Sequence, residues 1–100
     1  MGSLELIVEN KELTSTTSTI SYKIDEDRTD KRLIQILNEL TINIKDGENI
    51  VKTDTLTEEE ISNLQQAETK EIKYENLQPN TTYTIEIIGN VQLRNTIIIL

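Results

Sequence analysis

Apolar and polar residues alternate in short runs along most of the chain, and the clearest run is residues 16–24. There Ile20, Tyr22 and Ile24 would share one face, with polar residues between them. Side chains of a β-strand point alternately to its two faces, so this pattern predicts strands that place one face in a core. The strands predicted in this way cover residues 4–9, 16–24, 40–45, 50–55, 70–75, 82–88 and 94–100.

The first and last predicted strands differ from the others. Residues 4–9 have the pattern of an edge strand, and the polar stretch 11–15 after them is expected to lie outside the sheet. Residues 97–100 are apolar on both faces. That pattern predicts either a strand paired inside a sheet or a segment that leads directly into a further domain.

One helix is well marked, because Thr57 and Glu60 form the Thr-x-x-Glu pattern of a capping box. The Thr57 hydroxyl would accept a hydrogen bond from the first helical turn, and the Glu60 carboxylate would reach back to the backbone N–H of Thr57. Ile61 and Leu64 would share the buried face. We therefore predict a short helix from residue 58 to about Gln66 that connects two strands.

Two other connections have contrasting patterns. Residues 31–38 place their apolar side chains at a spacing that fits either a helix or an extended strand, and we favour a short helical or irregular connection. Asp46-Gly47 is typical of a hairpin turn, because glycine tolerates the positive φ that such turns need. A hairpin is therefore predicted between residues 40–45 and 50–55.

A chain of 100 residues has room for one domain with one hydrophobic core. Met1-Gly2-Ser3 has the form of an expression leader, so the domain is expected to cover residues 4–100. Phe and Trp are absent, and the aromatic residues are three tyrosines. The core is therefore predicted to be mainly aliphatic and to surround Tyr22, Tyr74 and Tyr83.

The composition argues against several functions. A formal net charge of −8 repels nucleic-acid phosphates and anionic lipids, so neither nucleic acid nor a membrane surface is an expected partner. The chain has no His and no Cys, which excludes a histidine-based triad, a thiol nucleophile and the usual zinc site. We predict that the protein is not an enzyme and has no catalytic residue, cofactor or metal ligand.

The densest acidic loop contains Asp25, Glu26, Asp27 and Asp30. Carboxylate oxygens of this kind can bind calcium. However, neighbouring Arg and Lys residues offset much of the charge, and no glycine marks an EF-hand turn. We interpret the segment as a solvated loop, with a calcium site as the alternative.

Residues 74–87, Tyr-Glu-Asn-Leu-Gln-Pro-Asn-Thr-Thr-Tyr-Thr-Ile-Glu-Ile, resemble the signature of fibronectin type III domains, Leu-x-Pro-x-Thr-x-Tyr followed by alternating apolar residues. The resemblance implies an all-β, immunoglobulin-like antiparallel sandwich of about seven strands, here with one short inserted helix. It also implies a tyrosine corner at Leu77, Pro79, Thr81 and Tyr83. Leu77 would fill the core, Pro79 would stiffen the turn, and the Tyr83 hydroxyl would bond to upstream backbone.

The chain departs from the family pattern in two respects. Tyr22 stands where members commonly have a buried tryptophan, and segments 25–38 and 57–66 are longer than a compact member needs. Together with Asp46-Gly47 and the Gly89-Asn90-Val91 turn, these segments resemble the divergent modules of phage tail and baseplate proteins.

Three remaining patterns have structural explanations. The carboxylates of residues 58–60 suit the positive end of a helix dipole. Asn80-Thr81-Thr82 matches a glycosylation sequence, but the family resemblance already accounts for these residues. Arg94 is a lone cation with no cluster around it that would bind an anion.

The resemblance implies a non-catalytic structural or interaction module that acts as a spacer or assembly domain of a larger phage tail or bacterial surface protein. Its expected partners are other domains of that protein or a protein assembly, and its expected location is a virion tail or a bacterial surface. The alternative is a recognition module that binds a carbohydrate or a protein through loops 25–30 and 46–49.

Overall fold

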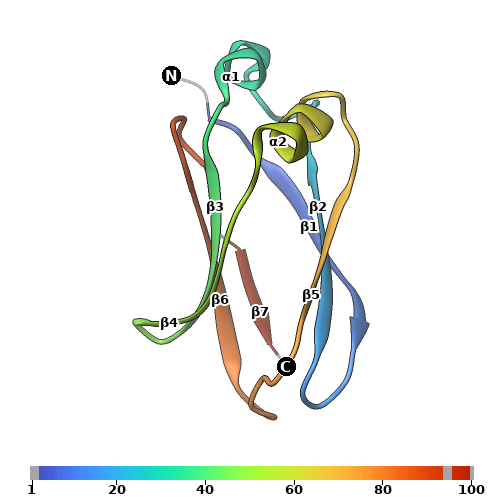
Figure 1. The fold of residues 1–100 in the computed structure, drawn as a ribbon, viewed down its shortest axis with the longest axis vertical. Coiled ribbons are helices and arrows are strands. Elements are labelled where there is room, and N and C mark those ends of the chain that lie inside the picture. Colours follow the sequence, from blue (N-terminus) through green and yellow to red (C-terminus); the bar gives the residue numbers. More distant parts are fainter. Residues whose placement is uncertain (1–2, 94–95, 100) are drawn as a thin grey trace.

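The computed structural model describes residues 3–93 and 96–99, which are mostly β-strand (Figure 1). The strands are β1 (Leu6–Leu13), β2 (Ser18–Ile24), β3 (Leu40–Asp46), β4 (Asn49–Thr55), β5 (Lys70–Tyr74), β6 (Thr82–Gly89) and β7 (Thr96–Ile99), and the helices are α1 (Lys31–Ile36) and α2 (Glu58–Gln65). The predictions made for Met1, Gly2, Arg94 and Leu100 lie outside the described residues.

The strands form two antiparallel sheets, with the orders β1-β2-β5 and β4-β3-β6-β7. Figure 1 shows the sheets as two facing layers, with both helices at one end. The β1–β2 and β3–β4 hairpins each stay within one sheet, whereas the connections from β2 to β3, β4 to β5 and β5 to β6 cross between the sheets. The predicted all-β, sandwich-like character is confirmed.

One hydrophobic core fills the space between the sheets. Its buried apolar residues are Leu4, Leu6, Ile20, Tyr22, Ile24, Leu37, Leu40, Ile42, Ile44, Leu56, Ile61, Leu64, Tyr74, Leu77, Tyr83, Ile85 and Ile87. The three tyrosines belong to this set, as the sequence predicts, and the rest of the core is aliphatic. The alternation that predicted the strands is therefore also the pattern of burial.

Strand β1 is longer than predicted, since it continues through Leu13 into the polar stretch that was expected to lie outside the sheet. Polar residues do not prevent pairing here, because β1 is an edge strand and its later side chains are exposed to solvent. A bulge between Asn10 and Glu12 shifts the register and keeps the strand paired with β2. The turn itself is shorter than predicted, with the Thr14 and Thr17 hydroxyls 2.6 Å apart.

The last strand, β7, pairs with β6 from residue 96 to 99 and lies at an edge of its sheet as far as the structure describes it. Of the two predictions for this segment, pairing in a sheet is confirmed, but among the described strands β7 lies at the edge and not inside the sheet. The reason is topological: β3 already occupies the other side of β6, so β7 adds to the free side.

Residues 31–36 are helical, which decides between the two interpretations that the sequence left open. The sandwich therefore contains two helices among the described residues, and the prediction of one inserted helix is wrong in number. The second helix, α2, matches its predicted range closely. It carries the chain across one end of the molecule from β4 in one sheet to β5 in the other, with Ile61 and Leu64 buried beneath it.

Two glycines meet specific backbone requirements. Gly47 has a φ of +61° in the β3–β4 turn, which agrees with the predicted hairpin. Gly89, at the end of β6, lies so close to β3 that an added Cβ would be 2.5 Å from the carbonyl oxygen of Glu39. The close approach of β6 to β3 therefore depends on the absence of a side chain at this position.

Candidate functional site

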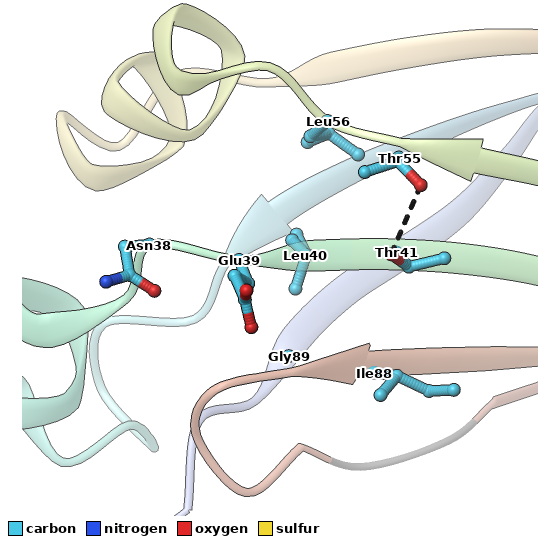
Figure 2. A pocket seen from close by; sticks show the side chains of 8 residues that line it. All are labelled: Asn38, Glu39, Leu40, Thr41, Thr55, Leu56, Ile88 and Gly89. Carbon is cyan, nitrogen blue, oxygen red and sulfur yellow. Dashed lines mark hydrogen bonds between the residues drawn. The ribbon is translucent and has the colours of Figure 1, made fainter.

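A hollow of about 270 Å³ opens at the helical end of the four-stranded sheet. It is lined by Asn38, Glu39, Leu40, Thr41, Thr55, Leu56, Ile88 and Gly89, which Figure 2 shows in place. Leu40 and Leu56 are buried, whereas Ile88 is exposed. The Thr41 and Thr55 hydroxyls lie 3.3 Å apart across the β3–β4 pair, as the dashed line in Figure 2 marks.

The backbone groups at the rim of this hollow are held by one side chain, that of Asn90. Its Oδ1 accepts hydrogen bonds from the N–H groups of Asn38 at 2.9 Å and Glu39 at 3.2 Å. Its Nδ2 donates to the carbonyl of Ile36 at 2.7 Å. These N–H groups are already paired within the protein, so they do not form an anion-binding rim.

The lining of the hollow also lacks a reactive pair of side chains. Glu39 supplies a carboxylate, while the Thr41 and Thr55 hydroxyls are hydrogen-bonded to each other. A glycosidase of the usual type needs a second carboxylate about 5–10 Å from the first, and no second carboxylate lines the hollow in the described part of the chain. The geometry there provides a shallow binding surface without a nucleophile and base in contact.

The acidic loop uses its carboxylates for local structure. Asp25 accepts a hydrogen bond from the N–H of Asp27 at 3.2 Å and lies 3.9 Å from Arg28. Asp30 caps α1 by accepting from the N–H of Arg32, and the Arg32 guanidinium, 3.0 Å away, lowers the pKa of Asp30. Within residues 3–93 and 96–99, no three carboxylates come close enough together to hold a metal ion.

The segment predicted to form a tyrosine corner connects β5 to β6. The Tyr83 hydroxyl accepts a hydrogen bond from the backbone N–H of Gln78 at 2.8 Å, and the Tyr83 ring is buried. Leu77 is buried in the core, and the Thr81 hydroxyl donates to the carbonyl of Pro79 at 3.1 Å. These four predicted residues are thus brought together at the β5–β6 connection, where the Tyr83 and Thr81 hydroxyls bond backbone groups and none of the four lines the hollow described above.

A second buried tyrosine contact links β2 and β5, two neighbouring strands of the three-stranded sheet. The hydroxyls of Tyr22 on β2 and Tyr74 on β5 are 2.9 Å apart in the core. Burial raises the pKa of Tyr74 to about 12, and burial together with the neighbouring Tyr74 raises the pKa of Tyr22 further still. Asp54 on β4 adds to both increases by its negative charge. The pair is neutral at physiological pH and holds β2 to β5.

The predicted capping residues of α2 lie as the capping box requires. The Thr57 hydroxyl accepts from the N–H of Glu60 at 3.2 Å, and the Glu60 carboxylate accepts from the N–H of Thr57 at 2.9 Å. Glu60 also forms an ion pair with Lys70 at the start of β5. Hydrogen bonds from Lys70 and from the Thr57 backbone lower the pKa of the Glu60 carboxyl. The cap therefore joins α2 to the strand that follows it.

Several polar residues with structural roles were missed from the sequence. Thr29, within the acidic loop, is buried and bonds both backbone groups of Glu5, at 2.9 and 3.1 Å. Gln65 donates to the carbonyls of Ile34 and Leu37 at 2.7 and 3.0 Å. Thr29 is the uncharged residue in a charged run, which could have marked it. Gln65 has no comparable signal, because its partners lie far away in the sequence.

Asn43 is a further missed residue, and it lies on the outer face of β3. Its side chain is nevertheless buried, because it donates to Glu86 on β6 at 3.1 Å and accepts from the hydroxyl of Thr53 on β4. Lys45 lies 3.5 Å from the same Glu86 carboxylate. A polar ladder thus crosses three strands on this face, and its signal in the sequence is an asparagine within a strand of β-branched residues.

No family model and no curated protein matches this chain in comparisons with known proteins. Among the described helices, none is long and apolar enough to span a bilayer.

Proposed function

We propose that the chain is a fibronectin type III-like module that spaces or assembles parts of a larger protein and catalyses no reaction. The strand order supports the family, because a three-stranded sheet with β1, β2 and β5 faces a sheet in which β3 and β6 are neighbours. The hydrogen bond from Gln78 N–H to the Tyr83 hydroxyl, just before β6, supports it as well.

The observation that carries the spacer role is the position of the two chain ends. Figure 1 shows that β1 begins at the end of the molecule with the helices, whereas β7 ends toward the opposite end. The molecule measures 39 × 24 × 23 Å along its principal axes, so the ends are separated along the long one. Modules joined through ends placed in this way extend along one axis, which is the arrangement that a spacer needs.

The use of polar groups fits a passive role. Across the described residues, every buried side-chain nitrogen or oxygen has a hydrogen-bond partner within the protein. The polar groups around the largest loops hold turns and helix ends, as Asn90, Thr29 and Asp30 do. Function at a site normally requires polar groups directed at a ligand. In the described part of the chain, the side-chain polar groups that remain available to a ligand are those on the exposed surface.

We extend the proposal to the class of parent protein, which we take to be a phage tail or bacterial surface protein. The support is the resemblance of the longer segments 25–38 and 57–66 to divergent modules of such proteins. Both segments are used at the same end of the molecule, where α1 and α2 lie side by side (Figure 1). Gln65 of α2 donates hydrogen bonds to carbonyl groups at the end of α1, so the two segments are joined to each other.

Small-angle scattering from direct tandem repeats of the chain tests the spacer role. Each added copy is expected to lengthen the particle by up to 39 Å, the long dimension of one module. The control joins the copies through long Gly/Ser linkers, which should give a broad distribution of lengths. Tandem repeats that fold side by side into a compact particle would overturn the spacer role. Hydrolysis of a glycoside or ester that Glu39→Gln abolishes would overturn the non-catalytic part.

A further inference from the structure

Strand β4 is an edge of its sheet, with β3 on one side and no described strand on the other. Just beyond β4, the N–H of Leu56 donates to the carbonyl of Leu40 at 2.9 Å. Backbone groups of an antiparallel strand point alternately to its two sides. The N–H and C=O groups of Thr53 and Thr55 therefore face away from β3, and β4 presents donors and acceptors there that pair with no described strand. The alternation ends at Val51, where the β3–β4 register shifts.

The side chains of β4 leave this edge open. Ile50 is 55% exposed and Val51 is 44% exposed, although both are large and apolar. Among the described elements, β4 packs chiefly against β3, and Figure 1 shows the β3–β4 hairpin projecting away from the rest of the molecule at the lower left. An exposed edge with apolar side chains is the kind of strand to which another strand can add.

Two charged residues on β4 make this edge self-complementary. Lys52 lies opposite Ile44 of β3, and Asp54 lies opposite Ile42. Both of these isoleucines are buried, so Lys52 and Asp54 point to the same inner side of the sheet. Neither charge takes part in an ion pair found in the described part of the chain.

A two-fold axis through Thr53 would use both charges at once. In an antiparallel pair of β4 strands centred there, each Lys52 lies opposite Asp54 of the second copy. The outward backbone groups of Thr53 then bond those of its own counterpart. A shift by two residues in one direction opposes Lys52 to Lys52, and a shift in the other direction opposes Asp54 to Asp54. Charge thus selects one register.

We propose that β4 pairs with β4 of a second copy of this chain, antiparallel about Thr53, so that the two four-stranded sheets become one continuous sheet. This pairing names a partner for the assembly role proposed above, and its biological use rests on that role. A lone inward charge on an edge strand normally opposes such pairing, because it meets its own counterpart. Here the neighbouring charge of opposite sign removes that opposition.

Sedimentation equilibrium of the full chain at about 0.15 M salt tests the proposal, since surface attraction between charges survives at contact distance under these conditions. The wild type is expected to show a dimer whose fraction rises with concentration. Lys52→Asp and Asp54→Lys should each weaken the dimer by about tenfold, because each replaces two attractive pairs with two repulsive ones. The double variant, Lys52→Asp with Asp54→Lys, should regain the wild-type association.

Matched controls lie on β5, whose Lys73 and Glu71 are also exposed charges on an edge strand. Lys73→Asp and Glu71→Lys change the net charge as the β4 variants do, yet they should leave the dimer intact. Asp54→Lys makes the protein less negative, which by general repulsion alone would strengthen association, so a weaker dimer in this variant points to the β4 contact. Circular dichroism of each variant checks that it is folded.

Thr53→Pro provides a test that does not depend on charge. The Thr53 N–H faces away from β3, so proline there removes a backbone hydrogen bond of the proposed dimer and no backbone hydrogen bond of the β3–β4 pair. Thr53→Val is the control, because it removes the hydroxyl that donates to Asn43 and keeps the N–H. Loss of dimer in a folded Thr53→Pro variant supports the contact. A wild type that stays monomeric up to about 1 mM overturns the contact, because a Kd of that size corresponds to a binding free energy of only about 4 kcal/mol. A double charge swap that dimerises no more tightly than either single variant overturns it as well.

These outcomes are distinct from those of the spacer test. A chain that is monomeric by sedimentation, but whose tandem repeats lengthen in scattering, overturns the β4 contact alone. A chain that dimerises through β4, but whose tandem repeats are compact, overturns the spacer role alone.

Discussion

The Tyr83 hydroxyl stabilises the turn before β6 through one bond, since it accepts from the N–H of Gln78 at 2.8 Å. We expect Tyr83→Phe to lower the free energy of unfolding by about 1–2 kcal/mol, because the ring stays in the core while the N–H loses its acceptor. Urea denaturation measures the change. Thr82→Ala, at an exposed neighbouring position, is the control and should have a smaller effect. If Tyr83→Phe leaves the free energy of unfolding unchanged, Tyr83 is an ordinary core aromatic and its hydroxyl does not stabilise the turn.

The buried hydroxyl pair of Tyr22 and Tyr74 predicts a loss of stability at alkaline pH. The pKa of Tyr74 is about 12 in the folded protein, that of Tyr22 is raised further, and tyrosine in an unfolded chain titrates near 10. A group whose pKa rises on folding contributes its full stability below the unfolded value and loses it as the pH rises. The free energy of unfolding should therefore be level up to about pH 9 and fall from about pH 10 to 12 and beyond.

Denaturant unfolding at a series of pH values measures this fall, and tyrosinate absorbance shows when the buried groups ionise. In Tyr74→Phe one of the two buried groups is gone, so the alkaline fall should be shallower. That variant should also lose about 1 kcal/mol near neutral pH, because the Tyr22 hydroxyl is left without its partner. A wild type with constant stability from pH 8 to about 12 would contradict the predicted ionisation behaviour.

At the scale of single residues, the sequence predicts the role of a residue when its hydrogen-bond partner lies nearby in the sequence. Tyr83 and Thr57 lie within a few residues of the groups they bond, so short motifs contain both members. Asn90, Gln65 and Thr29 bond residues 52, 31 and 24 positions away, respectively. Their roles depend on how the chain folds back on itself, and no spacing along the sequence encodes that.

At the scale of elements, the capping box of α2 predicts a dependence on acid. The pKa of the Glu60 carboxyl is lowered by Lys70 first and by the Thr57 backbone second. A carboxyl whose pKa falls on folding contributes stability above its unfolded value, about 4.3, and loses it as the pH drops through the folded value. Glu60→Gln should cost about 0.5–1 kcal/mol at pH 7 and progressively less below pH 4.

Thermal or urea unfolding of wild type and Glu60→Gln at stepwise pH measures this difference. Glu59→Gln is the matched control, because it removes a neighbouring carboxylate from the same turn without touching Lys70 or the cap. It should change stability less than Glu60→Gln does at pH 7. Equal effects of the two changes would attribute the whole contribution to the helix dipole.

The close approach of β6 to β3 at Gly89 predicts a second effect at this scale. Gly89→Ala would place a Cβ 2.5 Å from the Glu39 carbonyl, which is backbone and cannot rotate away. We expect a loss of about 1–3 kcal/mol, as for other substitutions that overpack a site. Denaturant unfolding measures it, and Gly47→Ala, with open space around its Cβ, tests strain from positive φ alone. A neutral Gly89→Ala would mean that the strands can separate there without cost.

Elements with a strong local signal were predictable, and those that depend on their neighbours were less so. Residues 31–36 have apolar side chains at a spacing that fits a helix or a strand, and the Asp30 cap that favours the helix lies in an acidic run where it gives no separate signal. The extension of β1 to Leu13 and the edge position of β7 follow from which strand sides were still free. The partner of β5 is β2, far away in sequence, and alternation alone cannot name it.

At the scale of the whole molecule, the net charge of −8 opposes the association of two copies, whereas the charges on β4 favour it. Two copies repel each other over the size of the molecule, whereas Lys52 and Asp54 attract each other only at contact. Salt shortens the screening length from about 30 Å at 0.01 M to about 10 Å at 0.1 M, so it weakens the long-range repulsion more than the contact pairs.

The dimer proposed through β4 should therefore strengthen as salt rises from about 0.01 to 0.1 M, in contrast to an interface held mainly by steering between opposite charges. Sedimentation equilibrium at several salt concentrations measures the trend. The double charge swap has the same net charge and should follow the wild type. Lys73→Asp adds negative charge away from β4, so its dimer should be weaker at low salt and approach the wild type as salt rises. A wild-type dimer that weakens steadily with salt would contradict this prediction. It would mean that attraction between the contact pairs outweighs the repulsion from net charge at every salt concentration tested.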